Sequence, residues 1–380
     1  MDDELCEYRY DLQALGDHVT TAVAKLPSRC RMFYAMKANS AAPILRTVAA
    51  RVNGFEVASG GELRKARAAD PAAEILFGGP AKSNAEIALA VRDGNTRIHA
   101  ESLLELHRIS SAAVAAETKV EVLLRVNIAD SLPAATISMG GRPTPFGIDE
   151  RLLPEAVQLA SNLPGLRFRG FHLHSLSNNL DHCAHLQMLE LYRDKALDWE
   201  ARFGVRIEHL DVGGGIGVNY HDLSEQFDWD AFTVGLARLV DTFPAHWRTI
   251  DFECGRYLVA GCGRYLVEVI DIKRNHGVDY VIVRGGTHHF RLPASWQHSH
   301  PFTVHPTDRV NSGLPRPEVV NGPVNVVGEL CTPKDVLAQN VHVARIRTGD
   351  VLAFEYAGAY GWDISHHDFL SHPHPDLTYQ

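Results

Sequence analysis

Eight short apolar runs alternate with helical patterns over the first two-thirds of the chain. Several of these runs are rich in Val, Ile and Phe and lack polar alternation, which is typical of strands buried on both faces. The runs are Cys30–Met36, Gly54–Ala58, Glu74–Phe77, Thr96–Ala100, Val120–Asn127, Phe168–Ser175, Ile207–Val212 and Thr249–Glu253. Eight strands alternating with helices predict a (β/α)₈ TIM-like barrel. Because the runs at 74 and 96 carry the weakest pattern, a doubly wound open sheet is the alternative.

From about residue 263 the pattern changes to short strand-like runs broken by Gly, Pro and Asn, with little helical periodicity. These runs are Tyr265–Lys273, Tyr280–Arg284, Val319–Val320, Val341–Ile346 and Val351–Phe354. We therefore expect a barrel domain over 11–262 and a C-terminal β-rich domain over 263–380, joined by a short strand within 1–10. The segment Ser371–Pro375 alternates His and Pro, so it is expected to be an extended surface tail or wrap.

Composition excludes some classes of function. The formal net charge of −9 argues against a nucleic-acid-binding protein, which would carry a basic patch. No apolar run approaches the roughly 18 residues of a membrane span, and the acidic start, Met1-Asp2-Asp3-Glu4, does not resemble a secretory signal. Six scattered cysteines without a CxxC pair indicate reduced thiols, so we expect a cytoplasmic protein with no nucleic-acid or membrane partner.

Reactive residue types follow the predicted strands. Lys37 ends the first strand, His172 and His174 end the sixth, Gly213–Gly215 follow the seventh, and Glu253 with Arg256 end the eighth. In a (β/α)₈ barrel the carboxyl ends of all strands meet at one rim, where active sites lie. The pattern therefore predicts one site at that rim.

Each of these residues also has an ordinary structural interpretation. Burial at a strand end can lower the pKa of Lys37, as a Schiff-base amine requires, but Lys37 could equally be a surface lysine. Gly213–Gly215 could offer backbone N–H groups to a phosphate, or could only form a tight turn.

The same holds for the eighth and sixth strands. Glu253 could keep a pyridine nitrogen protonated, and Arg256 could hold a phosphate, but the two could also form a local salt bridge. His174 could stack on a cofactor ring or could be a satisfied barrel histidine.

The remaining histidines do not predict a metal site. The chain has 21, including the adjacent pairs 288/289 and 366/367 and the spaced pairs 298/300 and 372/374. They lie in irregular stretches without the H-E-x-x-H spacing, so we expect no metal. No G-x-S-x-G motif supports a serine hydrolase.

Taken together, the motifs resemble the fold-type III pyridoxal 5′-phosphate (PLP)-dependent decarboxylases, the group of ornithine and diaminopimelate decarboxylases. The resemblance runs from about Tyr8 to about Phe369 in the family's order, with Lys37 in a Tyr34-Ala35-Met36-Lys37-Ala38-Asn39 signature. It implies an alanine racemase-like barrel in which Lys37 binds PLP covalently. It also implies a homodimer with active sites at the subunit interface.

The resemblance assigns further residues to the site. Those implied to contact the cofactor are Lys37, Arg125, His174, Ser177, Gly213, Gly214, Gly215, Glu253, Gly255, Arg256 and Tyr360. His174 matches the histidine that stacks on the ring, and Glu253 matches the partner of the pyridine nitrogen. Cys331 matches the cysteine that acts as an acid across the dimer interface. Lys37, Cys331, Glu253 and His174 are thus the expected catalytic residues.

Departures from the family pattern bear on the substrate. Glu56 stands where Asp is usual, Pro145 where Lys is common, Arg284 where ornithine-type enzymes carry Asp, and Thr332 where an acid follows the cysteine. Losing two carboxylates and gaining a guanidinium should favour a substrate with a distal anion rather than a distal ammonium.

The string from Arg284 to Pro293 and the tail Asp363–Pro375 resemble a narrower branch, the decarboxylases of citrate-based siderophore pathways such as staphyloferrin B or achromobactin. That branch implies a citrate-conjugated diamino acid as substrate. The residues expected to bind it are Arg284, His288, His289 and Thr332. Three alternatives stay open: a diaminopimelate or other diamino-acid decarboxylase, a racemase on the same barrel, and a PLP-binding protein without catalysis.

Overall fold

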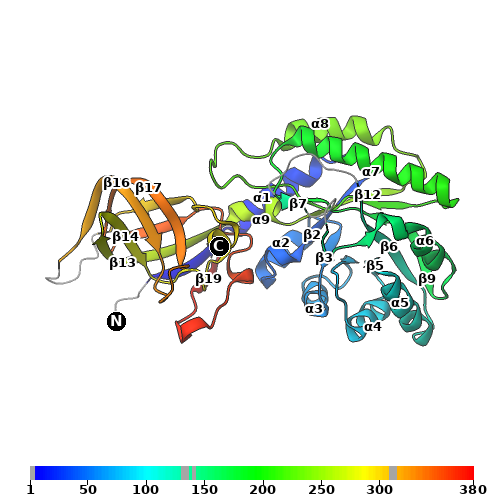
Figure 1. The fold of residues 1–380 in the computed structure, drawn as a ribbon, viewed down its shortest axis with the longest axis horizontal. Coiled ribbons are helices and arrows are strands. Elements are labelled where there is room, and N and C mark those ends of the chain that lie inside the picture. The colour runs from blue at the N-terminus through cyan, green and yellow to red at the C-terminus, as the bar shows by residue number, and fades with distance from the viewer. Residues whose placement is uncertain (1–4, 130–136, 139–142, 308–314) are drawn as a thin grey trace. The chain divides into compact units, whose positions relative to one another are not determined.

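The computed structural model of the chain describes residues 5–129, 137–138, 143–307 and 315–380. The chain divides into two compact units, each of which is described by itself (Figure 1). The barrel unit contains Gly16–Val218 and Gln226–Leu258. The sheet unit contains Met1–Leu15, Asn219–Glu225 and Val259–Gln380.

Eight parallel strands close into a barrel in the order β5-β4-β3-β2-β12-β11-β9-β6, with β6 pairing back to β5. The strands are β2 (Cys30–Ala35), β3 (Gly54–Val57), β4 (Glu74–Phe77), β5 (Thr96–Ala100), β6 (Val120–Asn127), β9 (Leu166–His172), β11 (His209–Asp211) and β12 (Thr249–Cys254). All eight predicted strands are confirmed, with ends shifted by up to three residues. Because the sheet closes, the open doubly wound alternative is wrong.

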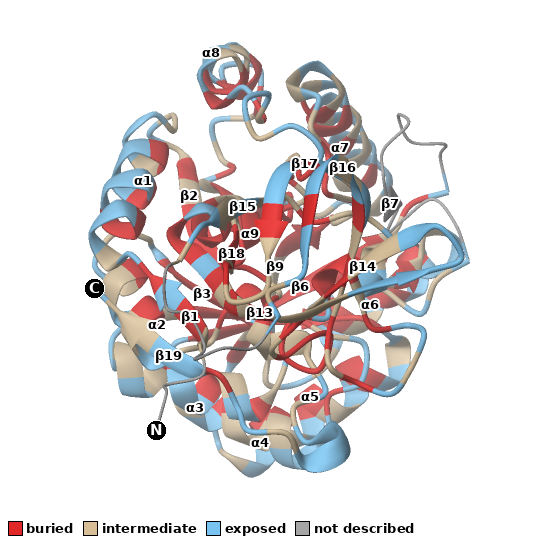
Figure 2. Ribbon diagram, turned by 90° about the vertical axis from the view of Figure 1, so that its left-hand side faces the viewer, coloured by how far each residue is buried: buried red, intermediate tan, exposed pale blue. Residues whose placement is uncertain are grey.

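Helices surround the barrel strands. They are α1 (Leu12–Ala24), α2 (Ala42–Ala49), α3 (Gly60–Ala69), α4 (Asn84–Asp93), α5 (Leu103–Ala115), α6 (Leu153–Asn162), α7 (His182–Phe203), α8 (Trp229–Val240) and the single turn α9 (Arg256–Val259). Ser59 caps α3 by accepting a hydrogen bond from the Glu62 N–H. The inner faces of α1 to α8 are buried and their outer faces exposed, as an amphipathic helix requires (Figure 2).

The sheet unit is built around the long strand β13 (Gly263–Asn275), which pairs with β1, β18 and β14 in turn. The other strands are β1 (Cys6–Tyr10), β14 (Val278–Val283), β15 (Phe302–His305), β16 (Glu318–Val327), β17 (Val336–Arg347), β18 (Val351–Phe354) and β19 (Asp376–Tyr379). One short helix, α10 (Leu292–Trp296), follows β14. The N-terminal strand β1 and the C-terminal strand β19 pair in parallel, so both chain ends belong to this sheet.

Two features of the sheet unit go beyond the predicted runs. β16 continues through Asn321-Gly322-Pro323, with register shifts further along its pairing with β17. The last residues form β19 after the extended His372–Pro375 stretch, and its Tyr379 ring stacks on Tyr10 at 5.1 Å.

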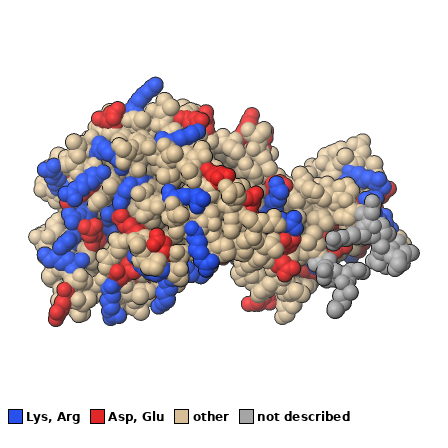
Figure 3. Space-filling view, turned by 180° about the vertical axis from the view of Figure 1, so that it is seen from behind, with Lys and Arg blue, Asp and Glu red and all other residues tan. Residues whose placement is uncertain are grey.

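Lys and Arg are interspersed with Asp and Glu on the face drawn in Figure 3. None of the helices in the described residues has the length and apolar character needed to traverse a bilayer.

Candidate active site

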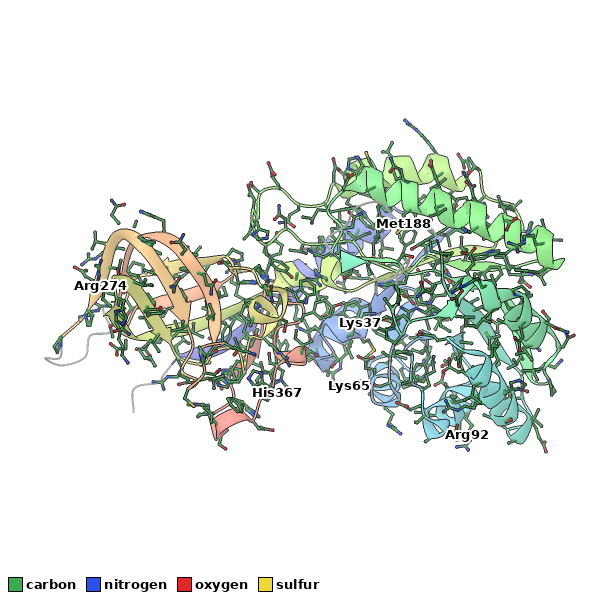
Figure 4. The ribbon with its side chains drawn as sticks, in the orientation of Figure 1. Lys37, Lys65, Arg92, Met188, Arg274 and His367 are labelled. Carbon is green, nitrogen blue, oxygen red and sulfur yellow. The ribbon has the colours of Figure 1, made fainter. Side chains whose placement is uncertain are left out.

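Lys37 is the second residue beyond the first barrel strand. β2 ends at Ala35, and the 3₁₀ turn η1 (Met36–Ala38) carries Lys37, whose side chain is 44% exposed (Figure 4). Its Nζ donates a hydrogen bond to Glu56 Oε2 at 3.0 Å. The amine is therefore accessible and held by a buried carboxylate.

Glu56 is a site residue that the sequence did not reveal as a partner of Lys37. It lies on β3, and the parallel register places it beside Ala35 of β2. Burial raises the pKa of Glu56, while the Lys37 ammonium opposes the shift. A carboxylate with a raised pKa at this position can exchange a proton with the lysine amine.

Glu253 is the second-last residue of β12 and lies on the inside of the barrel, where three imidazoles face it. His172 Nε2 lies 3.2 Å from Glu253 Oε2, His99 Nδ1 lies 3.5 Å from Oε1, and His174 Nδ1 lies 3.9 Å from Oε2. Burial is the main cause that lowers the pKa of each of the three histidines well below its ordinary value. The three rings are therefore neutral at pH 7, and the Glu253 carboxylate has no cation among them.

The glycine turn after β11 packs directly against these strands. A Cβ on Gly213 would lie 2.3 Å from His174 Nδ1, and one on Gly214 would lie 2.2 Å from the Glu253 carbonyl oxygen. The Gly213 N–H donates to Asp211 Oδ1, and the Gly214 N–H donates to His174 Nδ1. Two of the N–H groups that we expected to be available to a phosphate thus have partners inside the barrel. The second of these bonds places the proton of neutral His174 on Nε2.

Gly255 and Arg256 follow Glu253 directly. A Cβ on Gly255 would meet Ala38 Cβ at 3.0 Å, so this turn lies against the turn that carries Lys37. Arg256 begins α9 and is 5% exposed.

Arg125 and Ser177 occupy two other strand ends. Arg125 near the end of β6 donates to Glu101 Oε1 at 2.7 Å, and the other oxygen of Glu101 accepts the Gly147 N–H. Ser177 lies in the short strand β10 (Leu176–Ser177), which pairs with β7 (Ile137–Ser138). The predicted barrel residues thus lie at or just beyond the carboxyl ends of the strands.

The remaining predicted residues lie in the sheet unit, where Arg284 and His288 face Glu329. Arg284 Nη1 lies 3.7 Å from Glu329 Oε2, and His288 Nε2 lies 3.9 Å from Glu329 Oε1. His372 of the C-terminal tail reaches the same oxygen at 3.6 Å. Sequence reasoning missed Glu329, which lies two residues before Cys331, and it did not expect His372 to face this carboxylate.

The histidine pair is neutral rather than cationic. The rings of His288 and His289 lie 3.8 Å apart and are almost fully buried. Burial is the main cause that lowers the pKa of His288 to about 4 and that of His289 to about 3. At neutral pH these two histidines therefore add no positive charge, and Arg284 supplies the cation. His289 is also held in the core, because its backbone oxygen accepts a hydrogen bond from the Tyr8 hydroxyl.

Cys331, Thr332 and Tyr360 lie in irregular segments of the sheet unit. Cys331 is exposed, and Thr332 follows it in the same turn. Tyr360 has a positive φ of 53°, and its ring lies 6.0 Å from Trp296.

Comparison with known proteins gives the class to which this fold and site belong. The family described as pyridoxal-dependent decarboxylase, pyridoxal binding domain, matches residues 12–260. The chain belongs to the pyridoxal-dependent decarboxylases, and it is a PLP-dependent carboxy-lyase.

Among individual proteins, the chain is similar to a Staphylococcus aureus enzyme, 2-[(L-alanin-3-ylcarbamoyl)methyl]-2-hydroxybutanedioate decarboxylase. The two are 47% identical over 99% of this chain and 94% of the relative. Diaminopimelate decarboxylase of Bacteroides thetaiotaomicron is 29% identical over 93% of this chain and 90% of its own length. The crystal structure of diaminopimelate decarboxylase from Helicobacter pylori with L-lysine matches with a TM-score of 0.84 at 26% identity, covering 100% and 92% of the two chains.

The barrel residues fit PLP. The site offers an accessible amine, a glycine turn that a Cβ would fill, and a buried arginine. Among the described residues, Glu253 Oε1 is a buried oxygen without a hydrogen-bond partner. An amine for the aldehyde, a carboxylate for the ring nitrogen and cationic groups for the phosphate are the donor set that this cofactor requires.

Proposed function

We propose that this enzyme decarboxylates a diamino acid whose side-chain nitrogen is joined to a citrate-like hydroxy acid, in the biosynthesis of a siderophore. The observation that carries the proposal is the 47% identity to the S. aureus enzyme over nearly the full length of both chains. The name of that relative describes an alanine linked through carbon 3 and an amide to a hydroxybutanedioate. The diaminopimelate decarboxylases among the relatives shown are 28–31% identical, so they form the second candidate.

The charges in the sheet unit support an anionic substrate arm. Arg284 can bind a carboxylate with paired hydrogen bonds, whereas a distal ammonium would be repelled by it. Neutral His288 and His289 can donate ring N–H groups to carboxylate or hydroxyl oxygens, and Thr332 adds a hydroxyl group. The Glu329 carboxylate offsets the positive charge of Arg284. The substrate arm would therefore be recognised by hydrogen bonds as well as by charge.

In the barrel, each residue has a separate task in the proposed mechanism. Bound PLP supplies a ring that accepts the electrons left behind when carbon dioxide departs. Glu56 holds the Lys37 ammonium and can take its proton at the 3.0 Å contact, which frees the amine. Glu253 would hold the nitrogen of the bound cofactor ring with its negative charge.

Orientation comes from the neighbouring groups. The Gly214 N–H fixes the His174 imidazole, so its face can cover the ring. Arg256, Arg125, Ser177, Gly215, Gly255 and Tyr360 are the proposed phosphate and oxygen contacts. Cys331, which is exposed, is the proposed acid that returns a proton to Cα.

A substrate panel tests the proposal. Carbon dioxide release should be far faster from citryl-diaminopropionate than from free diaminopimelate, ornithine or lysine. Arg284→Gln should lower kcat/KM for the conjugate about 10- to 150-fold, mainly through KM, because a charge-assisted contact is lost. Arg274, an exposed arginine of β13, gives the matched control, Arg274→Gln (Figure 4). Preference for diaminopimelate would establish the second candidate instead.

We also propose that the enzyme is a cytoplasmic homodimer whose sites combine both chains. The resemblance to dimeric fold-type III enzymes and the exposure of Cys331 support this arrangement. Lys37→Ala and Cys331→Ala should each be inactive, and an equimolar mixture after subunit exchange should regain about one quarter of wild-type activity, because half of the dimers would carry one intact site. Exchange without recovery would show that Cys331 acts within its own chain or not at all.

A further inference from the structure

A cluster of buried ionisable groups lies behind Glu253 inside the barrel. It consists of His99 at β5, His172 at β9, Asp211 at β11 and Glu253 itself, and one side-chain atom of each lies within 4.8 Å of the others. All four side chains are at most 3% exposed. The roles proposed above use Glu253 but leave His99 and Asp211 without a task.

Six atoms of this cluster have no hydrogen-bond partner among the described residues, the two ring nitrogens of His172 included, and the other four match one another in pairs. Among the described residues, both ring nitrogens of His99, Oδ2 of Asp211 and Oε1 of Glu253 are buried without a hydrogen-bond partner. His99 Nε2 lies 3.4 Å from Asp211 Oδ2, and His99 Nδ1 lies 3.5 Å from Glu253 Oε1. Four buried atoms left unsatisfied would be costly, whereas two hydrogen bonds through His99 would satisfy all four.

We propose that Asp211 and His99 form a positioning relay for Glu253, in which a neutral Asp211 donates its O–H to His99 Nε2 and His99 donates Nδ1–H to Glu253 Oε1. This inference rests on the proposed role of Glu253 beside the cofactor ring. Asp211 and His99 are positioning residues, because they act through Glu253.

The direction of the relay follows from the surroundings of Asp211. Its Oδ1 accepts the Gly213 N–H at 2.8 Å, which leaves Oδ2 as the atom that faces His99. Two further carboxylates, Glu253 and Asp251, are close enough to oppose its ionisation. Burial, helped by these two, raises the pKa of Asp211 well above its ordinary value. Asp251 itself is paired with Arg31 and Arg97, so we assign the shared proton to Asp211.

The relay holds the Glu253 carboxylate in a fixed orientation. Oε1 receives the His99 N–H, while His172 Nε2 lies 3.2 Å from Oε2, so the orientation of the carboxylate is restricted. An ionised Asp211 would instead attract the His99 N–H and leave a ring lone pair facing Glu253. The other titratable or charged groups that influence the cluster from neighbouring elements are Lys37, Glu56, Lys82, Arg97, Arg125, His174 and Asp251.

A divalent cation is the competing occupant of the same four side chains. Two imidazoles and two carboxylates suit zinc in kind and number. A cation would, however, draw on the Glu253 charge that the ring nitrogen requires, and it would need an ionised Asp211. Metal analysis of the purified holoenzyme therefore belongs to the test, and one bound metal per chain would overturn the relay.

The test uses His99→Leu, His99→Gln and Asp211→Asn in the holoenzyme, with His185→Leu as a matched loss of a buried imidazole elsewhere. Two readouts are recorded: kcat for decarboxylation, and the pH midpoint of the visible absorption of the lysine-bound cofactor. His99→Leu should lower kcat about 10- to 100-fold and raise the midpoint by about one pH unit, because Glu253 loses one donor. His99→Gln, which can still accept and donate, should recover part of both.

Asp211→Asn is the decisive variant. An amide reproduces a protonated acid, since its N–H₂ can donate to His99 while its oxygen accepts from Gly213, so both readouts should stay within about twofold or 0.3 pH units of wild type. The relay would be overturned if Asp211→Asn behaves like His99→Leu. It would also be overturned if His99→Leu behaves like His185→Leu and like wild type. If the variants show these spectral shifts but the wild-type enzyme does not act on the citrate conjugate, the substrate proposal is refuted and the relay still stands.

Discussion

Two neighbouring layers of side chains inside the barrel make opposite kinds of polar contact. β5 contributes Arg97 to one and His99 to the other, and β12 contributes Asp251 and Glu253. A spacing of two residues puts each pair on the same face of its strand. In the layer nearer the amino ends, Asp251 is bonded to Arg31 at 2.8 Å and to Arg97 at 3.0 Å. One step along the same strands, Glu253 faces three neutral imidazoles and the carboxyl group of Asp211.

The difference separates stability from chemistry within one set of strands. The first layer is an ion-pair network in which Glu74 joins Asp251 in pairing with Arg31 and Arg97, so its charges are largely neutralised. In the second layer, the Glu253 carboxylate forms no ion pair with the neutral imidazoles that face it. This layer lies at the rim where a (β/α)₈ barrel places its active site. A charge that is already paired cannot respond to a ligand, whereas the Glu253 carboxylate can.

The largest effect should come from the rim. Lys37→Ala should abolish decarboxylation and remove the visible absorption of the covalently bound cofactor, because we propose no other amine that forms this bond. Borohydride reduction followed by peptide mass analysis measures the adduct directly. Lys65→Ala, on the outer helix α3, is the control and should behave as wild type (Figure 4). A reducible adduct of undiminished yield in Lys37→Ala would contradict the assignment.

The amino-end layer should respond in stability. Asp251→Ala leaves the buried guanidinium of Arg97 and the half-buried guanidinium of Arg31 each short of one partner, and breaking a buried ion pair from one side costs about 3–5 kcal/mol. Urea unfolding at neutral pH should show a loss near the lower end of this range, because Glu74 still pairs with both arginines. The kcat per folded molecule should stay nearly unchanged. A variant with wild-type stability and impaired turnover would reverse the comparison between the layers.

Glu253→Gln should give the opposite result. The side chain keeps its size but loses the charge that faces the ring nitrogen, so kcat should fall about 10²- to 10³-fold, in the range found for lost electrostatic stabilisation. The free energy of unfolding should change by less than about 1 kcal/mol, because the carboxylate has no cationic partner in its layer. The same urea titration and the decarboxylation assay measure both quantities. Near-normal turnover would assign Glu253 a structural role.

The sequence predicted the strands of the barrel well because buried parallel strands appear in a sequence as continuous apolar runs. It also located Lys37 and Glu253, since residues that follow such runs must lie at the same rim. It could not predict pairs that depend on strand register, such as Lys37 with Glu56, or His99 with Glu253 across 154 positions. Nor could it show that the amides of Gly213 and Gly214 are already bonded.

The sheet unit was less predictable for a different reason. Asn321-Gly322-Pro323 is a turn signal in sequence, yet in the structure it lies inside β16. β19 carries almost no apolar pattern, and it is held by its parallel pairing with β1 at the other end of the chain. Strands that depend on long-range pairing and bulges leave a weak local signal.

The smallest effect concerns a buried histidine outside both layers. His185 lies on α7 between Phe227 and Phe232, and burial lowers its pKa to about 4. An unfolded histidine has a pKa near 6.5, so between these values the unfolded chain binds more protons than the folded one. The stability that neutral His185 contributes is therefore complete above about pH 6.5 and is lost as the pH falls toward 4.

This sign leads to a measurable difference between two pH values. At about pH 5 the loss from one such histidine amounts to about 2 kcal/mol. His185→Gln keeps a polar partner for Asn179 but does not titrate, so the drop in unfolding free energy between about pH 7.5 and pH 5 should be smaller than in wild type by up to that amount. His107→Gln, at an exposed position of α5, should keep the wild-type drop. An unchanged drop in His185→Gln would show that His185 does not contribute to the acid sensitivity of the chain.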